Sequence, residues 1–128
     1  GTALEVVRVD GRTRFTVPVP MWQSRLVAFV PAVPARLVAT ASSAARVGAD
    51  ATLKLAMLDS AGNTVAAPWP MLVTVTAPDG SVHRGLSQRV LATAGTAEMV
   101  LPFANNDPTG TWSVTVEDRI LGLKTTLA

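Results

Sequence analysis

The stretch LPFANNDPTGTWSVTVE, residues 101–117, contains the clearest strand–loop–strand pattern in the chain. A strand is predicted to end at Phe103, a polar loop follows at residues 105–110, and a second strand begins at Thr111. Apolar and polar side chains alternate along this second strand: Trp112, Val114 and Val116 against Thr111, Ser113, Thr115 and Glu117. Because successive side chains of a strand point to opposite faces, the pattern predicts one buried and one hydrated face. Such strands are typical of an antiparallel sandwich, and Trp112 is predicted to lie in its core.

The same alternation, with a Gly-bearing turn between most segments, extends through the rest of the chain. Strands are predicted at residues 4–9, 13–19, 23–30, 35–41, 51–59, 71–77, 82–91, 96–103, 111–117 and 123–127. No stretch repeats apolar residues with the 3.6-residue period of a helix. Short strands at near-regular spacing predict an all-β, antiparallel sandwich.

Composition excludes several classes of protein. Of the 128 residues, 48% are hydrophobic and 16% are charged, which is too apolar for a disordered linker. No apolar run approaches the ~20 residues that cross a bilayer, so no membrane insertion is predicted. There is no cysteine, which excludes disulfides and thiolate metal sites. The chain has a net charge of +2, and its arginine cluster at residues 8–25 is interpreted as the hydrated faces of strands, so no nucleic-acid partner is predicted.

The sequence Pro31-Ala32-Val33-Pro34 is the best candidate for a domain boundary. Two prolines in four residues favour an extended, semi-rigid connector. Before it, Asp10-Gly11 between two β-forming runs predicts a hairpin, and residues 1–31 are predicted to be a separate segment, with residues 35–128 forming the sandwich. The strand-like run that follows Gly1-Thr2-Ala3 leads us to expect a segment of a longer chain.

The turn motifs after residue 35 resemble those of a known family. They read LDSAGNTV at residues 58–65, VTAPDG at 75–80, GTA at 95–97 and NDPTGTWSV at 106–114. In this order they resemble bacterial immunoglobulin-like modules, particularly the macroglobulin-type subset. The resemblance implies an immunoglobulin-like β-sandwich of about seven to nine strands, with an N-terminal β-hairpin extension. It implies no catalytic residues.

The N-terminal residues carry a different and shorter likeness. The run TVPVPMWQSRLVAFVP, residues 16–31, is similar to the closing strands of the small β-domain in large bacterial glycoside hydrolases. Together the two resemblances imply a non-catalytic accessory module of a larger extracellular or cell-envelope bacterial protein, a carbohydrate-active hydrolase. Its expected partners are neighbouring domains of the same chain, which it would space or contact.

Two tryptophans are candidate ligand-binding residues. Trp69, in Pro68-Trp69-Pro70, either closes one end of the sandwich, which we favour, or is exposed and stacks on a sugar ring. Trp22 lies at a proline-flanked corner and is predicted to pack where the N-terminal segment meets the sandwich. The alternative function is therefore a carbohydrate-binding module that uses Trp69 and Trp22, with polysaccharide as the partner.

No other residue type points to a reaction or a cofactor. His83 is the only histidine, and no spacing marks a nucleophile and an acid around it, so a solvated strand histidine is favoured. Asp107 and the two amides before it could supply some calcium ligands, but Asx residues before proline also favour turns for local reasons. The glutamates Glu5, Glu98 and Glu117 show no pairing for glycoside hydrolysis. No catalytic residue, metal or cofactor is predicted.

Overall fold

The computed structural model describes residues 4–42 and 48–128, and this part of the chain is all-β, as predicted. Its nine strands pair antiparallel throughout, and it contains no helix. The strands are β1 (Val6–Val9), β2 (Arg12–Phe15), β3 (Arg36–Ala41), β4 (Asp50–Leu58), β5 (Trp69–Thr76), β6 (Gln88–Ala92), β7 (Thr96–Pro102), β8 (Ser113–Asp118) and β9 (Lys124–Leu127).

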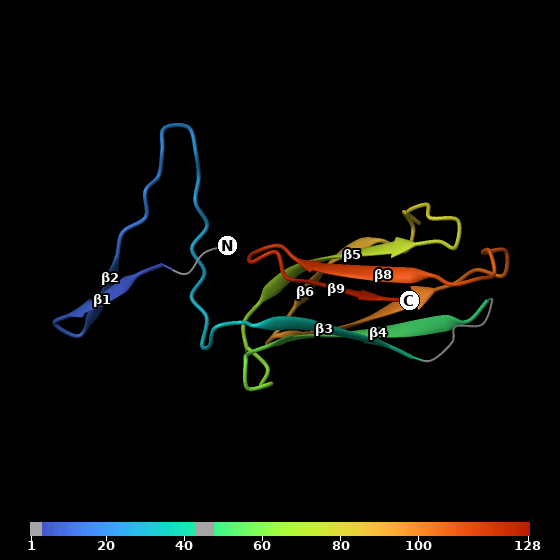
Figure 1. Cartoon of the computed structure of the whole chain (residues 1–128), viewed down its shortest axis with the longest axis horizontal. Helices are drawn as coiled ribbons and strands as arrows, with labels where there is room; N and C mark the ends of the chain where they lie inside the picture. Colours follow the sequence, from blue (N-terminus) through green and yellow to red (C-terminus); the bar gives the residue numbers. More distant parts are fainter. Residues whose placement is uncertain (1–3, 43–47) are drawn as a thin grey trace.

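Seven of the strands form a sandwich of two sheets. One sheet has the order β3-β4-β7 and the other the order β6-β5-β8-β9, and the two lie face to face in Figure 1. In the first sheet Leu53 of β4 lies opposite Met99 of β7, and in the second Val73 of β5 lies opposite Val116 of β8. All four of these side chains are buried, so the register of each sheet places them between the layers.

The alternation seen in the sequence corresponds to the observed burial. Along β4 every second residue is buried, and along β5 the same holds. The buried hydrophobic cluster is Leu37, Ala39, Ala51, Leu53, Leu55, Met57, Val65, Ala67, Trp69, Met71, Val73, Val75, Leu86, Ala92, Met99, Leu101, Val114 and Val116. Because all its members lie between residues 37 and 116, the sandwich contains a complete core of its own.

The turns follow the expected chemistry of glycine and aspartate. Asp10 and Gly11, which join β1 to β2, have φ angles of 51° and 72°, the pair of left-handed residues that a two-residue hairpin turn requires. Gly95, between β6 and β7, has a φ angle of 82°, and a β-carbon there would collide with the carbonyl oxygen of Val65. Only glycine fits this position without a shift of the backbone.

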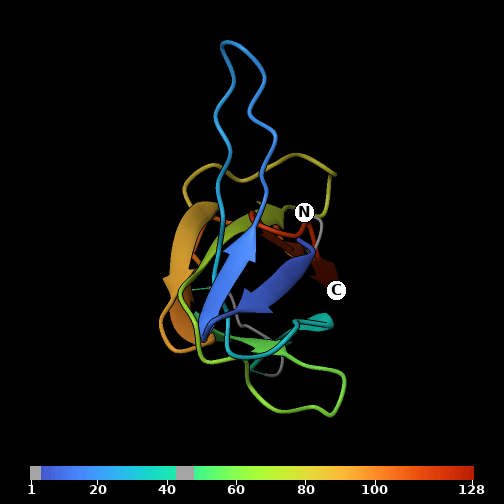
Figure 2. The ribbon, with the colours of Figure 1, turned by 90° about the vertical axis from the view of Figure 1, so that its left-hand side faces the viewer.

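The first 30 described residues stand apart from the sandwich. We call residues 4–33 the arm. Strands β1 and β2 pair only with each other, and the chain then runs out to a tip and back before it enters β3 (Figures 1 and 2). Of the arm, Val30 and Ala32 pack against the core of the sandwich.

The strand predicted at residues 13–19 ends at Phe15, and two other predicted strands differ further from the structure. Residues 23–30 are extended but form no strand, and residues 82–87 form a single bridge and a turn before β6 begins at Gln88. In the second case the amide groups of Leu86 and Ser87 donate to the carbonyl of His83, which turns the chain away from the sheet. In the first case the neighbouring limb contains Pro18 and Pro20, which lack the N–H groups that a ladder needs.

Candidate interaction site

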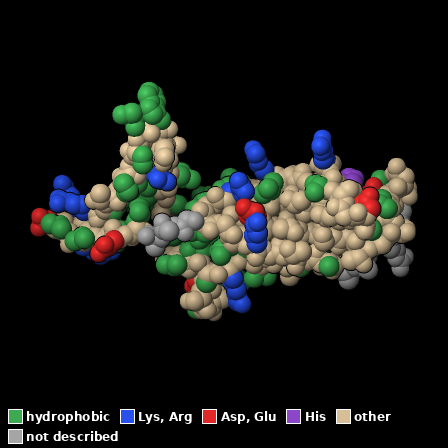
Figure 3. Space-filling view, turned by 45° about the horizontal axis from the view of Figure 1, so that its top comes forward, with side chains coloured by type: hydrophobic (Ala, Val, Ile, Leu, Met, Phe, Trp, Pro, Cys, Tyr) green, Lys and Arg blue, Asp and Glu red, His purple; other side chains and the backbone are tan. Residues whose placement is uncertain are grey.

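Exposed apolar side chains are concentrated on the arm. Ten of the thirteen large hydrophobic side chains that are exposed in the described residues belong to it. The highest exposed fractions are 97% for Trp22, 84% for Leu26 and 81% for Met21. Figure 3 shows hydrophobic side chains gathered over the arm, whereas much of the sandwich surface has other groups. Isolated exposed apolar residues are ordinary, but a continuous group of this size marks a contact surface.

The total exposed surface supports the same interpretation. The chain exposes 8788 Å². A monomeric globular protein of 13.3 kDa is expected to expose about 6,500 Å², so the excess is about 2,300 Å². One partner of a standard protein–protein interface buries about 800 Å². The excess is therefore large enough for a stable interface.

The tip of the arm presents Trp22. The amide of Gln23 donates to the carbonyl of Pro20 at 3.1 Å and closes a tight turn, in which Trp22 has a φ angle of 65°. A residue with a β-carbon in this left-handed conformation costs roughly 1–2 kcal/mol. The prediction that Trp22 packs against the sandwich is wrong, because the turn lies at the end of the arm and no other element reaches its side chain.

The two limbs of the arm are held together by side chains. The rings of Phe15 and Phe29 meet edge to face, with their centroids 5.7 Å apart. The limbs, residues 15–20 and 23–30, run side by side in both ribbon views (Figures 1 and 2). No backbone ladder joins them, since the pairing of β2 ends at Phe15. The limbs therefore present both their side chains and their backbone groups to solvent.

Trp69 is buried, which makes the alternative of an exposed, sugar-stacking Trp69 wrong. Its side chain is 1% exposed, and its Nε1–H donates to the carbonyl of Val65 at 3.1 Å. Trp69 is the first residue of β5, in phase with the buried Met71, Val73 and Val75. The side chain thus packs inside the sandwich, and of the two candidate tryptophans only Trp22 is accessible to a ligand.

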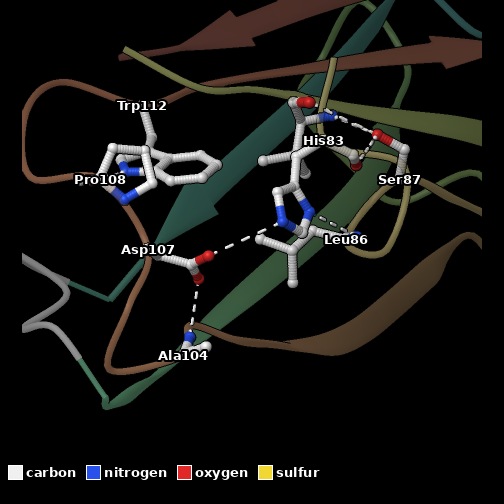
Figure 4. A network of polar contacts seen from close by, with 8 residues as sticks. His83, Leu86, Ser87, Ala104, Asp107, Pro108 and Trp112 are labelled. Carbon is white, nitrogen blue, oxygen red and sulfur yellow. Dashed lines mark hydrogen bonds and ion pairs between the residues drawn. The ribbon is translucent and has the colours of Figure 1, made fainter. Parts of the chain in front are cut away.

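Trp112 contacts the core but is half-buried. It precedes β8, at the end of the sandwich away from the arm, where its ring meets Phe103 edge to face at 5.0 Å. The ring of His83 lies beside it, with the centroids 5.6 Å apart (Figure 4). Its Nε1–H donates to the carbonyl of Pro108 at 3.1 Å. Trp112 thus covers one end of the core. The strand pattern had predicted that it lies within the core, and this prediction is wrong in that the ring is only half-buried.

His83 lies in a polar network that the sequence did not reveal. Its Nδ1 accepts a hydrogen bond from the amide of Leu86 at 3.2 Å, and its Nε2 lies 3.8 Å from Oδ1 of Asp107. The other carboxylate oxygen of Asp107 accepts from the amide of Ala104 at 2.7 Å. Figure 4 shows this network joining the loop after β5 to the loop after β7.

This network does not have the geometry of a catalytic triad. The hydroxyl of Ser87 donates to the carbonyl of His83 at 2.9 Å and accepts from the amide of Val75 at 2.9 Å. Its proton is therefore held by the backbone, and neither nitrogen of the imidazole is placed to remove it. The arrangement links the loop after β5 to the loop after β7, and it does not activate Ser87 as a nucleophile.

The acidic groups of the turns are engaged by the chain itself. Asp59 accepts hydrogen bonds from the amides of Ala61 and Asn63, and the bond from the Asn63 amide is the main reason that its pKa is lowered. The pKa of Asp79 is lowered mainly by the hydroxyl of Ser81. Within the described ranges no group of three or more metal-ligating side chains converges.

The glutamates do not face a common cleft. Glu98 lies on β7 and pairs with Lys54 at 3.7 Å, whereas Glu117 lies on β8 of the other sheet and binds Arg119 and Lys124 at 3.0 Å each. A shallow hollow of about 490 Å³ covers the outer face of β4 and its neighbours, where the Lys54–Glu98 pair is surrounded by small side chains. Asp118 is fully buried, and its carboxylate accepts from the turn amides of Ile120 and Leu121. We find no paired carboxylates for glycoside hydrolysis among the described residues.

Comparisons with known proteins do not assign the chain to a family. No protein-family model matches it, and a search of curated proteins finds no significant match. In the part of the chain that the structure describes, no helix has the length and apolar character needed to cross a membrane.

Proposed function

We propose that the chain is a non-catalytic accessory module of a larger secreted or cell-envelope bacterial protein, a carbohydrate-active hydrolase, and that it holds a neighbouring domain through its arm. The observation that carries this proposal is the apolar surface of the arm, led by Trp22 at 97% and Leu26 at 84% exposure. Large exposed apolar surfaces mark sites of contact, and contact with another protein is one of the commonest kinds. The hydrolase context rests on the likeness of residues 16–31 to closing strands in such enzymes.

The sandwich itself would act as a spacer. Its seven strands divide into sheets of three and four, which supports an immunoglobulin-like module. Its core is complete without the arm, so the body can hold its shape while the arm makes the contact. The connector at residues 31–34 contains two prolines, which limit the range of angles between the arm and the sandwich.

The absence of catalysis is part of the proposal. Ser87 and His83 are bound to the backbone as described above, and the glutamates Glu98 and Glu117 belong to different sheets. Purified chain should release no product from a panel of plant and bacterial polysaccharides. Turnover above the buffer blank, abolished by His83→Ala, would contradict this part of the proposal.

Residue-specific oxidation tests the contact. We expect hydroxyl-radical footprinting to label Met21 and Trp22 strongly in the isolated chain, and at least about fivefold less in the complete natural polypeptide, where a neighbouring domain covers them. Trp69 and Met71, which are buried in the sandwich, serve as internal controls and should remain protected in both samples. Equal labelling of Met21 and Trp22 in the two samples would refute the contact.

A carbohydrate-binding module remains the second candidate, now with a single aromatic residue. The observation in its favour is the full exposure of Trp22 at a turn. A sugar ring would pack the C–H groups of one face on the exposed indole, whose apolar body and polar N–H suit such a contact. Tryptophan fluorescence titrated with soluble polysaccharides would show a saturable shift that Trp22→Ala removes, and a shift that survives in Trp22→Ala would exclude this candidate.

A further inference from the structure

The backbone of the arm beyond β2 has almost no hydrogen-bond partner. Across residues 16–34 the only backbone hydrogen bond is the one that closes the turn, from the amide of Gln23 to the carbonyl of Pro20. The next bond along the chain joins the amide of Ala35 to the carbonyl of Leu58, where the sandwich begins. Extended backbone with unpaired N–H and C=O groups is the template on which another strand pairs.

One part of this backbone is suited to be a strand. Residues 23–30 contain no proline, and their last five residues, Leu26 to Val30, are all apolar. Leu26 and Phe29 point to solvent, with 84% and 76% of their surface exposed. A strand that is apolar on both faces is stable only when both faces are covered. Within the chain only Val30 of this segment packs against the core.

The adjacent limb of the arm cannot supply the missing sheet edge. The limb beside residues 23–30 contains Pro18 and Pro20, neither of which has an N–H to donate. The turn at Trp22 places this proline-containing limb beside residues 23–30, so the hairpin offers them no other strand to pair with. The acceptor edge therefore lies outside this hairpin, and in the structure residues 23–30 pair with none of the edge strands of the sandwich.

We infer that residues 23–30 add as a strand to the open edge of a β-sheet in a neighbouring domain of the same polypeptide. This inference rests on the proposed function and specifies how the contact is made. In strand addition the backbone hydrogen bonds give affinity, and the alternate side chains give specificity. Here Leu26 and Phe29 would enter the apolar faces of the acceptor, and Trp22 would mark the end of the added strand.

Charge favours a neighbouring domain over a second copy of the chain. The arm has four arginines and two acids, a net charge of +2, whereas residues 34–128 have seven basic and seven acidic residues and are neutral. All the net charge of the chain therefore lies on the arm. Two arms side by side would bring like charges together, and the neutral sandwich of a second copy offers no net opposite charge, whereas an acceptor edge with an acidic rim would be complementary. Arg25, within the segment, is placed to meet that rim.

Amide hydrogen exchange measured by mass spectrometry tests the inference. In the isolated chain the amides of residues 24–30 should exchange at the rate of unstructured peptide. In the complete natural polypeptide they should exchange at least about 100-fold more slowly, as amides in a stable sheet do. The variant Val27→Pro removes one N–H and should abolish the protection, whereas Val27→Ala keeps the N–H and should retain most of it. The sandwich strand β5 should be equally protected in all samples.

The outcomes separate the inference from the proposed function. If Met21 and Trp22 become protected from oxidation while the amides of residues 24–30 still exchange freely, the contact is real and strand addition is wrong. If neither changes, both are wrong. If the amides are already protected in the isolated chain, and light scattering shows a dimer that Val27→Pro dissociates, a second copy occupies the strand and the inference is overturned.

Discussion

Replacing Trp69 with alanine is the sharpest test of the core. Trp69 is the largest fully buried side chain in the described residues, and it is the first residue of β5. Its Nε1–H donates to the carbonyl of Val65, but that carbonyl also accepts from the amide of Ala67 at 2.8 Å. The variant therefore leaves no buried carbonyl without a partner. Its cost comes from lost apolar burial and a cavity, about 3–5 kcal/mol.

A loss of this size is easy to measure. Native domains are stable by about 5–15 kcal/mol, so Trp69→Ala removes a large fraction of the total. For a domain of this size each kcal/mol lowers Tm by about 4–8 °C, and the variant should melt at least about 12 °C below wild type. Urea unfolding followed by circular dichroism should show a lower midpoint with an unchanged m-value, which indicates a change of stability without a change of compactness.

Two further variants make the result specific. Trp22→Ala removes an equally large side chain that is 97% exposed, and it should change the free energy of unfolding by less than about 0.5 kcal/mol. Trp69→Phe keeps a ring but loses the hydrogen bond, worth about 1 kcal/mol, and some volume, so it should fall between wild type and Trp69→Ala. If Trp69→Ala lies within about 1 kcal/mol of wild type, or if Trp22→Ala costs as much, the assignment of inside and outside is wrong.

Three more variants test other parts of the structure. Trp112→Ala should cost about 2 kcal/mol in urea unfolding, less than Trp69→Ala, because its ring is only half-buried; an equal cost would place it in the centre of the core. The hydrogen bond from Lys124 is the main cause that lowers the pKa of Glu117 below its ordinary 4.5. Because the folded pKa is depressed, this contact stabilises the fold above the unfolded value, and its contribution is lost as pH falls through the folded pKa. Lys124→Gln should therefore raise the pKa of Glu117 in an NMR titration and weaken the dependence of stability on pH in that acidic range; an unchanged pKa would refute the contact. Deletion of residues 1–33 should lower Tm by no more than about 5 °C, because only two arm side chains pack on the core; unfolding of the truncated chain would show that the arm belongs to the sandwich.

The sandwich was predictable because each of its strands has a partner and a core to face. Alternation with a period of two is the direct record of a strand that is buried on one side, and β4, β5 and β8 follow it almost residue by residue. The sequence was less informative at Trp69, because Pro70 interrupts the strand pattern. Pro70 is nevertheless accommodated in β5, where its carbonyl accepts from the amide of Arg119. With Pro70 included in the strand, Trp69 falls in phase with Met71 and its burial follows.

The contacts around His83 could not be predicted from local patterns. Asp107 and Trp112 come from the loop between β7 and β8, and His83 from the loop between β5 and β6. These loops meet only because the two sheets pack with these ends together, and the spacing of residues in the sequence does not predict such a contact. A turn at Asp107 was expected from its place before Pro108, and this is correct, since its carboxylate accepts from the amide of Ala104.

In the arm, residues 23–30 have the sequence pattern of a strand but form no strand. Residues 23–30 were predicted as a strand because their composition suits one that is covered on both faces, yet they pair with no strand in the part of the chain that the structure describes. An exposed apolar segment of this kind lowers solubility and adds no stability to an isolated arm. We therefore expect another domain, outside residues 4–128, to cover it. A two-stranded hairpin such as β1–β2 is only marginally stable alone, and it too would gain from that cover. The disagreement between pattern and structure is therefore the strongest argument that a neighbouring sheet completes the arm.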